Sequence, residues 1–340
     1  MKLSVAMITY NHERYIAQAI ESVLAQNVTF DYEVVIGEDC STDHTRAILM
    51  DYQRRYPDRI RLILRDRNVG AMRNFAETIE ACRGEYVALL EGDDYWRCTD
   101  KLQKQVDFLD GHPDYAICCG RAHTLYESDM PDCPAKSDLY PDISAGRYTV
   151  DDIINGDFAP TATLVLRRHL IPPFPKWFFE MKMGDWPLLA LTARSGSIQL
   201  MDEVLAMYRV HAGGVWSSMA FFSRQIESIR MLRSLDQELQ YRYHDTVRKT
   251  IARCYLLMAA SSRSQKRWTD TAKYLLACIR NGGWRGPTSA RTISGRVAFW
   301  LMACWFRTYR AGRALIRPMR LAFHRQPSDS QPDAWPGEQK

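Results

Sequence analysis

The sequence has little that would stabilise a chain covalently or carry it across a membrane. Its nine cysteines are odd in number and form no C-x-x-C pair, which predicts a reducing compartment and argues against a structural zinc site. The apolar run at 297–306 has about half of the roughly 20 residues that a membrane-spanning helix needs. The N-terminus offers one basic residue, a short apolar run and no small-residue cleavage site. We therefore expect a first strand there and not a signal peptide.

Two phosphate-binding fingerprints are also absent. The chain contains neither G-x-x-x-x-G-K-S/T nor G-x-G-x-x-G after a predicted strand, which leaves a P-loop or a Rossmann dinucleotide site unsupported. No internal repeat is strong enough to predict a solenoid. The composition, 46% apolar and 25% charged, is that of a globular protein, and 340 residues allow one large domain or two ordinary ones.

Acidic residues are missing from one long C-terminal segment. Residues 271–328 contain eleven Lys and Arg and no Asp or Glu, whereas residues 1–270 are slightly acidic although the whole chain has a net charge of +5. Basic residues flank the apolar run, which includes Trp300 and Trp305. This combination favours a helix on an anionic membrane surface, through residues 285–325, followed by a flexible end. The alternative is a helix that packs on the rest of the chain with a solvated Arg face. Clustered Trp and Phe without a recognised nucleic-acid-binding fold argue against a nucleic acid partner.

The first third of the chain alternates β-rich runs with runs of helical spacing. Strands are predicted at about 2–8, 32–37, 59–64 and 85–90, with helices between them that begin near Asn11, near Thr42 or Asp43, and, after the fourth strand, at Thr99. This order predicts β-α-β units in an α/β fold with a Rossmann-like, mostly parallel sheet flanked by helices. Further on, we expect a loop at 130–146, added strands at 161–166 and 198–201, and a helical extension from about 218 to 279.

Each early strand is followed by a polar cluster. The clusters are Thr9-Tyr10-Asn11, Glu38 to Asp43, Asn68-Val69-Gly70, and Glu91-Gly92-Asp93-Asp94. In a parallel sheet all four fall at one edge, where open α/β sheets bind their ligands. Taken alone, the last cluster is more often a solvated acidic turn. Together the clusters predict a site for a nucleotide and for Mg²⁺ or Mn²⁺, which proteins hold with one or two carboxylates and substrate phosphates.

The side chains at this edge suit the parts of a nucleotide. Tyr10 offers an aromatic face for stacking on a base, and Asp39 can accept a hydrogen bond from a base N–H. Asp93 can hold ribose hydroxyls, and Asp94 can bind the cation that neutralises a diphosphate. We therefore predict a nucleotide diphosphate as the ligand.

In their order and spacing these motifs resemble those of the inverting glycosyltransferases of family 2, which have the GT-A fold. The family's T-Y-N start corresponds to Thr9-Tyr10-Asn11, its D-D-x-S-x-D turn to 38–43, its N-x-G-x-x-x-x-N segment to 68–75, and its D-x-D-D-x-W element to 91–96. The resemblance implies that the nucleotide sugar is bound by Thr9, Tyr10, Asn11, Glu38, Asp39, Asn68, Gly70, Arg73 and Asp93. Glu38, Cys40 and Glu91 depart from the family's Asp, Gly and Asp.

Two later segments extend the resemblance to about residue 218. Gly184-Asp185-Trp186 is similar to the family's G-D-W, which implies that Asp185 is the catalytic base; on sequence alone, Asp185 is more often the N-cap of a helix. Tyr208-Arg209-Val210-His211 is like the family's Y-R-x-H, which implies that His211 and Asp94 bind Mn²⁺ or Mg²⁺. A lone histidine of this kind is more often structural.

The resemblance implies three regions and one reaction. Residues 1–218 would be a GT-A catalytic domain, 219–283 a helical region, and 284–340 a basic, aromatic-containing tail. The reaction would be the inverting transfer of a sugar, most often from a UDP donor, to a hydroxyl of a saccharide or glycolipid. We expect it to act in cell-surface polysaccharide synthesis, in the cytoplasm at the inner face of the membrane.

Two alternatives stay open. A nucleotidyltransferase of related fold would carry a Gly-rich, basic loop after the first strand, which His12 and Glu13 do not provide. An inactive, membrane-associated scaffold would not need Asp39, Asp93, Asp94 and Asp185, all of which are present. The sugar, the base of the donor and the acceptor are not identified by the sequence.

Overall fold

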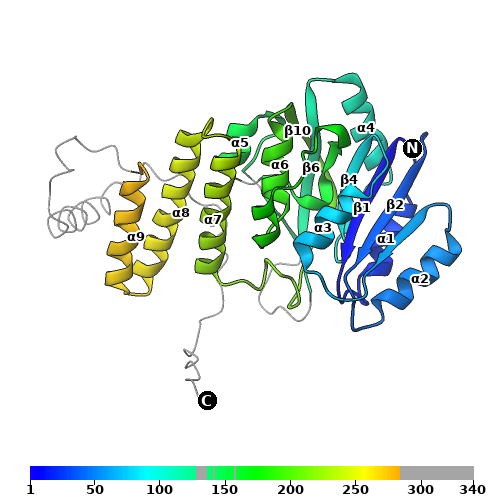
Figure 1. The fold of residues 1–340 in the computed structure, drawn as a ribbon, viewed down its shortest axis with the longest axis horizontal. Helices are drawn as coiled ribbons and strands as arrows, with labels where there is room; N and C mark the ends of the chain where they lie inside the picture. Colours follow the sequence, from blue (N-terminus) through cyan, green and yellow to red (C-terminus); the bar gives the residue numbers. More distant parts are fainter. Residues whose placement is uncertain (128–135, 141, 157, 284–340) are drawn as a thin grey trace, which may run out of the picture. The chain divides into compact units, whose positions relative to one another are not determined.

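The computed structural model of the chain describes residues 1–127, 136–140, 142–156 and 158–283 (Figure 1). The membrane-surface helix expected within 285–325 and part of the loop expected at 130–146 lie outside the described residues. The first third of the chain alternates strands and helices, as predicted. In chain order its elements are β1 (Leu3–Thr9), α1 (Ile16–Leu24), β2 (Tyr32–Glu38), α2 (Thr45–Arg55), β3 (Ile60–Leu64), α3 (Ala71–Glu80), β4 (Tyr86–Glu91), β5 (Tyr95–Trp96) and α4 (Lys101–Gly111).

The next part of the chain adds strands that are mostly antiparallel to their neighbours. These and the helices among them are β6 (Tyr115–Tyr126), β7 (Lys136–Asp138), β8 (Gly146–Tyr148), α5 (Val150–Asn155), the 3₁₀ turn η1 (Thr161–Thr163), β9 (Val165–Arg167), α6 (Asp185–Ala193) and β10 (Ser197–Val210). Two further 3₁₀ turns, η2 (Arg168–Leu170) and η3 (Lys176–Glu180), precede α6.

Within the described residues the strands form one sheet, in the order β3-β2-β1-β4-β9-β6-β10-β5, with β7 beside β6 and β8 beside β10. The first four strands are parallel, as predicted. β9 is antiparallel to both β4 and β6, and β10 runs parallel to β6 but antiparallel to β5 and β8. The fold is therefore α/β with a mixed sheet flanked by helices.

Helices cover both faces of the sheet because its central strands are apolar on both sides. In β1, Leu3, Val5 and Met7 pack with apolar residues of α1, α2 and α4. Ala6 points to the other face, into a second cluster formed with α3, α5, α6, α7 and α8. Burial on both faces explains why β1, β2 and β4 are continuous apolar runs without alternation.

One predicted strand is wrong in its first half. Residues 161–163 form the turn η1, and the strand β9 starts only at Val165. The strand was predicted because Thr161 and Thr163 are β-branched, and β-branched residues are common in strands. In the structure the hydroxyl and the N–H of Thr163 both donate to the carbonyl of Pro160, a local bond that competes with strand pairing.

Several strands were not predicted, above all β6 in the centre of the sheet. Its sequence is interrupted by Gly120, which weakens a strand pattern. A Cβ at Gly120 would lie 2.5 Å from a methyl carbon of Leu205, so only glycine lets β10 approach β6 here. The predicted strand 198–201 is the beginning of the longer β10, and β7 lies inside the expected loop.

The predicted helix starts are correct only in part. Asp100 is the N-cap residue of α4, next to the predicted Thr99. The prediction for Asn11 is wrong: α1 begins at Ile16, and Asn11 has φ 56° and accepts the N–H of Thr42 instead. This bond links the ends of β1 and β2, so Asn11 serves the loop and not the helix.

The helical extension is confirmed. It consists of α7 (Phe221–Glu238), α8 (His244–Ser264) and α9 (Trp268–Arg280). α7 and α8 bury Ile229, Leu232 and Ile251 in the same core as α5 and α6. Among the described residues no helix is both long and apolar enough to cross a bilayer.

One lysine is buried without a polar partner in the described part of the chain. Lys101, the first residue of α4, is fully buried, its Nζ has no hydrogen-bond partner among the described residues, and it lies 4.3 Å from the centre of the Trp96 ring. Burial lowers the pKa of Lys101 from 10.5 to about 7, because an ammonium group loses its hydration inside the protein. Lys101 therefore destabilises the fold at neutral pH.

We expect Lys101→Met to raise the free energy of unfolding at pH 7. Between pH 7 and 10.5 the unfolded chain binds the proton and the folded chain does not. The stability of the wild type should therefore rise with pH, by up to about 1.4 kcal/mol per unit. The variant lacks this slope, so the difference in unfolding free energy between the variant and the wild type should shrink as the pH approaches 10.5. Urea unfolding of the two proteins at pH 7, 8.5 and 10 measures this difference. A difference that does not change with pH would contradict the lowered pKa of Lys101.

Candidate functional site

The polar clusters meet because the parallel strands end at the same level. β1 pairs with β2 and β4 so that Thr9 lies opposite Glu38 and Ile8 opposite Glu91. β3 pairs in parallel with β2, with Leu64 opposite Glu38. All four clusters therefore leave from one edge of the sheet, as the sequence predicts.

The acidic turn after β4 is packed tightly against the end of β1. The N–H of Gly92 donates to the carbonyl of Ile8 at 2.9 Å. A Cβ at Gly92 would lie 2.8 Å from Thr9 Oγ1 and 3.0 Å from His12 Nδ1, closer than real side chains approach. Glycine is therefore required here, and it sets the acidic residues directly beside His12.

Two histidines face the carboxylate of Asp93. Asp93 Oδ2 lies 3.1 Å from His211 Nε2 and 3.6 Å from His12 Nε2. One ligand atom from each of the three residues lies within 4.8 Å of the others. We call these residues the His12–Asp93–His211 group. They come from the end of β1, the end of β4 and the residue after β10, so the sheet itself brings them together.

The charge states within this group suit a cation. Burial opposes the ionised form of Asp93, but His12 and His211 hold its pKa below the usual value. Burial lowers the pKa of His12, which keeps its imidazole neutral near pH 7. An ionised carboxylate beside a neutral imidazole is the form in which both bind metal ions.

Asp94, predicted as the metal ligand together with His211, lies outside this group. Its Oδ1 accepts the backbone N–H of Arg209 at 2.8 Å. Burial, with repulsion from Asp93 and Glu91, raises the pKa of Asp94 well above its usual value. The geometry brings Asp93, and not Asp94, to the histidines.

Arg209 connects the acidic turn to the start of α1 and to the residue that follows β6. Its Nε donates to the carbonyl of Asp93 at 2.8 Å, Nη2 donates to Gln18 at 2.7 Å, and Nη1 pairs with Glu127. The guanidinium also lies over the Tyr15 ring at 4.6 Å. Only 7% of the side chain is exposed, so this residue fixes the turn from within the protein.

The two acidic residues that end β2 are buried and hydrogen-bonded. Glu38 is fully buried, accepts the N–H of Ser41 and pairs with Arg46. Asp39 accepts the N–H groups of Val69 and Gly70 at 2.7 and 3.0 Å. Burial raises the pKa of Asp39, although the two backbone donors favour its ionised form. Both carboxylates thus hold the loops of the edge together.

The remaining predicted donor-binding residues are spread along the same edge. Tyr10 is 42% exposed, while Thr9 is buried and its hydroxyl has no hydrogen-bond partner among the residues that the structure describes. Asn68 accepts the N–H of Gly70 at 3.1 Å, and Gly70 has φ 89°, which favours glycine. Arg73, on α3, has a mostly exposed side chain 5.8 Å from the Phe179 ring.

Asp185 is the first residue of α6, and Gly184 takes the N-cap position. Asp185 Oδ2 accepts the hydroxyl of Thr161 at 2.7 Å, and Oδ1 accepts the N–H of Trp186 at 2.8 Å. Burial, Asp93 and Asp185 together raise the pKa of Glu91 well above its usual value. Asp185 is therefore close enough to the acidic turn to act on it electrostatically.

Sequence reasoning missed two residues of this site. His12 directly follows the polar cluster of the first strand, and that position was the available signal. Thr161 was assigned to a strand, so nothing in the sequence linked it to Asp185.

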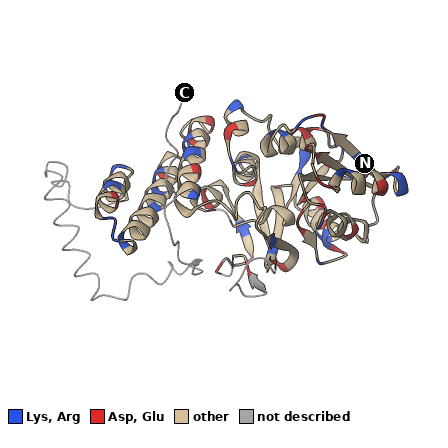
Figure 2. Ribbon diagram, turned by 90° about the horizontal axis from the view of Figure 1, so that it is seen from below, with Lys and Arg blue, Asp and Glu red and all other residues tan. Residues whose placement is uncertain are grey.

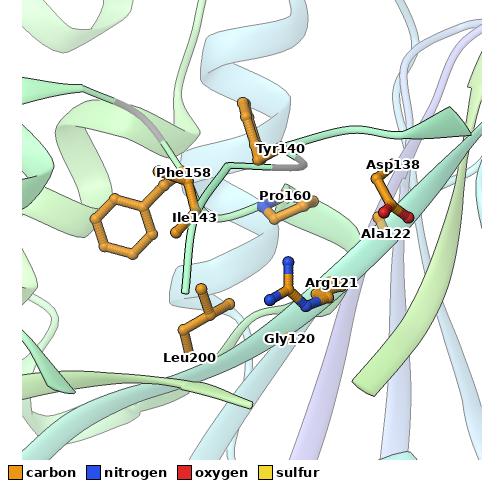
Figure 3. Close-up of a pocket in the computed structure, with 9 residues that line it drawn as sticks. All are labelled: Gly120, Arg121, Ala122, Asp138, Tyr140, Ile143, Phe158, Pro160 and Leu200. Carbon is orange, nitrogen blue, oxygen red and sulfur yellow. The ribbon is translucent and has the colours of Figure 1, made fainter. Parts of the chain in front are cut away.

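Two cavities in the described part of the chain lie away from this edge. One, of about 10 Å³, lies between β6, β7 and β10 and is lined by Arg121, Asp138 and Phe158 among others (Figure 3); it has room for one water molecule. A second, of about 270 Å³, lies at the amino ends of β6 and β10, beside Arg147 and Arg194. Neither is lined by a predicted site residue.

We expect Arg209→Met to lower the free energy of unfolding by about 3–5 kcal/mol, because the half-buried Glu127 and the acidic turn lose a buried cation. Arg121→Met is the matched control: it breaks an ion pair with Asp202, whose side chain is 73% exposed, and should cost about 1 kcal/mol or less. Urea unfolding measures both. Equal small losses would show that Arg209 does not stabilise the turn.

Residues 4–168 match the family model for glycosyl transferase family 2. An uncharacterized glycosyltransferase of Nostoc sp. is 33% identical over 238 residues, covering 67% of this chain and 70% of the relative. An uncharacterized protein of Mycobacterium tuberculosis is 39% identical over 217 residues, 64% of this chain. The chain spans only 61% of the length of that mycobacterial relative. TuaG of Bacillus subtilis, a putative teichuronic acid biosynthesis glycosyltransferase, is 28% identical over 70% of this chain and 94% of its own length.

Solved structures show the same fold. TarS of Staphylococcus aureus in complex with UDP-GlcNAc superposes with a TM-score of 0.61 at 20% identity, over 83% of this chain and 81% of that chain. The mannosyltransferase PcManGT of Pyrobaculum calidifontis, in complex with GDP-Man and Mn²⁺, gives 0.51 at 16% identity, over 83% and 87%. With the family match and the Nostoc relative, the conclusion is that this chain belongs to glycosyl transferase family 2 and has a GT-A-like fold.

Proposed function

We propose that the protein transfers a sugar, with inversion, from a nucleotide-diphosphate donor to a hydroxyl of a saccharide or glycolipid. The observation that carries the proposal is the His12–Asp93–His211 group at the carboxyl edge of the sheet, with Asp185 close enough to act on the same acidic turn. A cation-binding group and a carboxylate at one edge are the two parts that such a transfer needs.

The group fits a divalent cation. Its three ligand atoms converge within 4.8 Å, and two imidazoles with one carboxylate favour Mn²⁺ over Mg²⁺, which prefers oxygen ligands. The related structure PcManGT was solved with Mn²⁺. We assign Asp93 and His211, with His12, to this cation, in preference to Asp94. When bound, the cation supplies positive charge against the leaving diphosphate.

Asp185 is the proposed base. It stands at the N-terminus of α6, where the helix dipole favours an ionised carboxylate. It would take the proton of the acceptor hydroxyl as that oxygen attacks the anomeric carbon from the face opposite the diphosphate. General-base catalysis of this kind contributes about 10² to 10⁴ in rate.

The donor would lie along the edge formed by the loops after β1, β2 and β3. Exposed Tyr10 would stack on the base of the donor. The other residues proposed to line the donor at this edge are Thr9, Asn11, Asn68, Gly70 and Arg73. Glu38 and Asp39 would act by holding these loops, because their carboxylates already accept hydrogen bonds from the chain. UDP is the proposed nucleotide; TarS was solved with UDP-GlcNAc and PcManGT with GDP-Man.

The proposed setting is cell-surface polysaccharide synthesis at the inner face of the membrane. The name of TuaG supports it, and so does that of TarS, a poly(ribitol-phosphate) N-acetylglucosaminyltransferase. We propose that residues 285–325 contact anionic lipids. Lys and Arg already outnumber Asp and Glu on α8 and α9, which precede this segment (Figure 2).

Calorimetry with UDP, GDP, dTDP and CDP, with and without Mn²⁺, tests the site. We expect one nucleotide to bind tightly only with Mn²⁺, and Asp93→Asn to weaken that binding at least tenfold. Asp94→Asn is the matched control and should keep most of the metal dependence. Asp185→Asn should bind the nucleotide normally and lose about 10² to 10⁴ in transfer rate. No binding of any nucleotide would favour the inactive scaffold; loss of metal dependence in Asp94→Asn alone would restore the assignment of the metal to Asp94.

Liposome flotation tests the membrane contact. The full chain should float with vesicles that contain 30% anionic phosphatidylglycerol and stay behind with pure phosphatidylcholine, because basic segments bind anionic surfaces. A chain that ends at residue 284 should lose most of this binding. Equal flotation of both chains would refute a role for the tail.

A further inference from the structure

The carboxylate of Asp185 is held by a hydroxyl from a different element. Thr161, in the turn η1, donates to Asp185 Oδ2 at 2.7 Å. The other oxygen, Oδ1, accepts the N–H of Trp186 at 2.8 Å. A carboxylate has about four sites that can accept hydrogen bonds. One bond on each oxygen fixes the plane of the group and leaves sites free for an acceptor hydroxyl.

The turn that carries Thr161 is itself rigidly bound. Trp96 Nε1 donates to the carbonyl of Ala162 at 2.6 Å, and Gln105 Nε2 donates to that of Thr163 at 2.8 Å. The side chains of Ala162 and Thr163 are buried, with 1% and 0% exposed. The hydroxyl of Thr161 is therefore presented from a fixed frame between β4 and β6 and not from a mobile loop.

Rotation of the Asp185 carboxyl group would break its hydrogen bond to Thr161, and such a bond is worth more to a charged acceptor than to a neutral one.

We propose that Thr161 is a positioning residue for the transfer reaction, which holds Asp185 in the orientation that receives the proton of the acceptor. The inference rests on the proposed role of Asp185 as base. Thr161 does not touch the donor or the acceptor in this account; it acts through Asp185 alone. A purely structural role, in which the hydroxyl only stabilises the start of α6, predicts a loss of stability without a loss of turnover.

The test compares Thr161→Val, which removes the hydroxyl at constant shape, with Thr161→Ser, which keeps it. Turnover is measured as the release of nucleoside diphosphate from the nucleotide sugar that the calorimetric panel identifies, with water as acceptor. We expect Thr161→Val to lower kcat about 10- to 100-fold with an unchanged Kd for the nucleotide, and Thr161→Ser to stay within threefold of the wild type.

Thr163→Val is the matched control, because it removes a hydroxyl that bonds only to Pro160 in the same turn. It should lower the melting temperature and keep kcat. An equal loss of kcat in Thr161→Val and Thr163→Val would assign the effect to the turn as a whole and overturn the proposal, and so would normal turnover in Thr161→Val.

A double-mutant cycle separates this inference from the proposed function. If Thr161 acts through Asp185, then adding Thr161→Val to Asp185→Asn should cause no further loss of kcat. Full additivity would overturn the positioning role. Should Asp185→Asn itself keep normal transfer, the proposed function fails; should it lose transfer while Thr161→Val does not, only the present inference fails.

Discussion

The site depends on how three carboxyl groups within four residues, at Glu91, Asp93 and Asp94, are held beside one another at the end of β4, with Asp94 buried and the other two half-buried. Ionised groups cannot be held so close together and largely away from water without compensation. Asp93 is compensated by His12 and His211, Asp94 by the N–H of Arg209 together with a raised pKa, and Glu91 by a raised pKa that favours its neutral form. β10, the residue that follows it and the loop after β1 supply these compensating groups.

The sequence predicted the edge of the sheet well and the details of the turn poorly. Continuous apolar runs predicted β1, β2 and β4 correctly. The expected parallel pairing of these strands then predicted that Thr9, Asp39 and Asp93 lie at one edge of the sheet. Whether Asp93 or Asp94 faces the histidines could not be read from adjacent residues. It is decided by Arg209, 115 positions away in sequence from Asp94. The role of Thr161 was missed for a similar reason. Residues 161–163 were predicted as strand, but a local hydrogen bond from Thr163 to Pro160 favours a turn there.

Two departures from the family motifs have local explanations in this chain. Glu38 stands where the motif has Asp, and its longer side chain reaches Arg46, which also donates to the carbonyl of Arg65. Cys40 stands where the motif has Gly and adopts φ 61°, a conformation that costs other L-residues about 1–2 kcal/mol. The backbone therefore keeps the shape that the glycine of the motif permits, and the chain accepts the strain of a side chain there.

The hydrogen bond between Asp93 and His211 is made by the chain alone. Its two residues come from strands that are far apart in sequence, and the bond holds them at a spacing that a ligand can use. The entropy of ordering these side chains is thus lost when the protein folds and not when a donor arrives. A binding surface that is already ordered needs fewer new contacts for a given affinity, which suits an enzyme that must also release its product after every turnover.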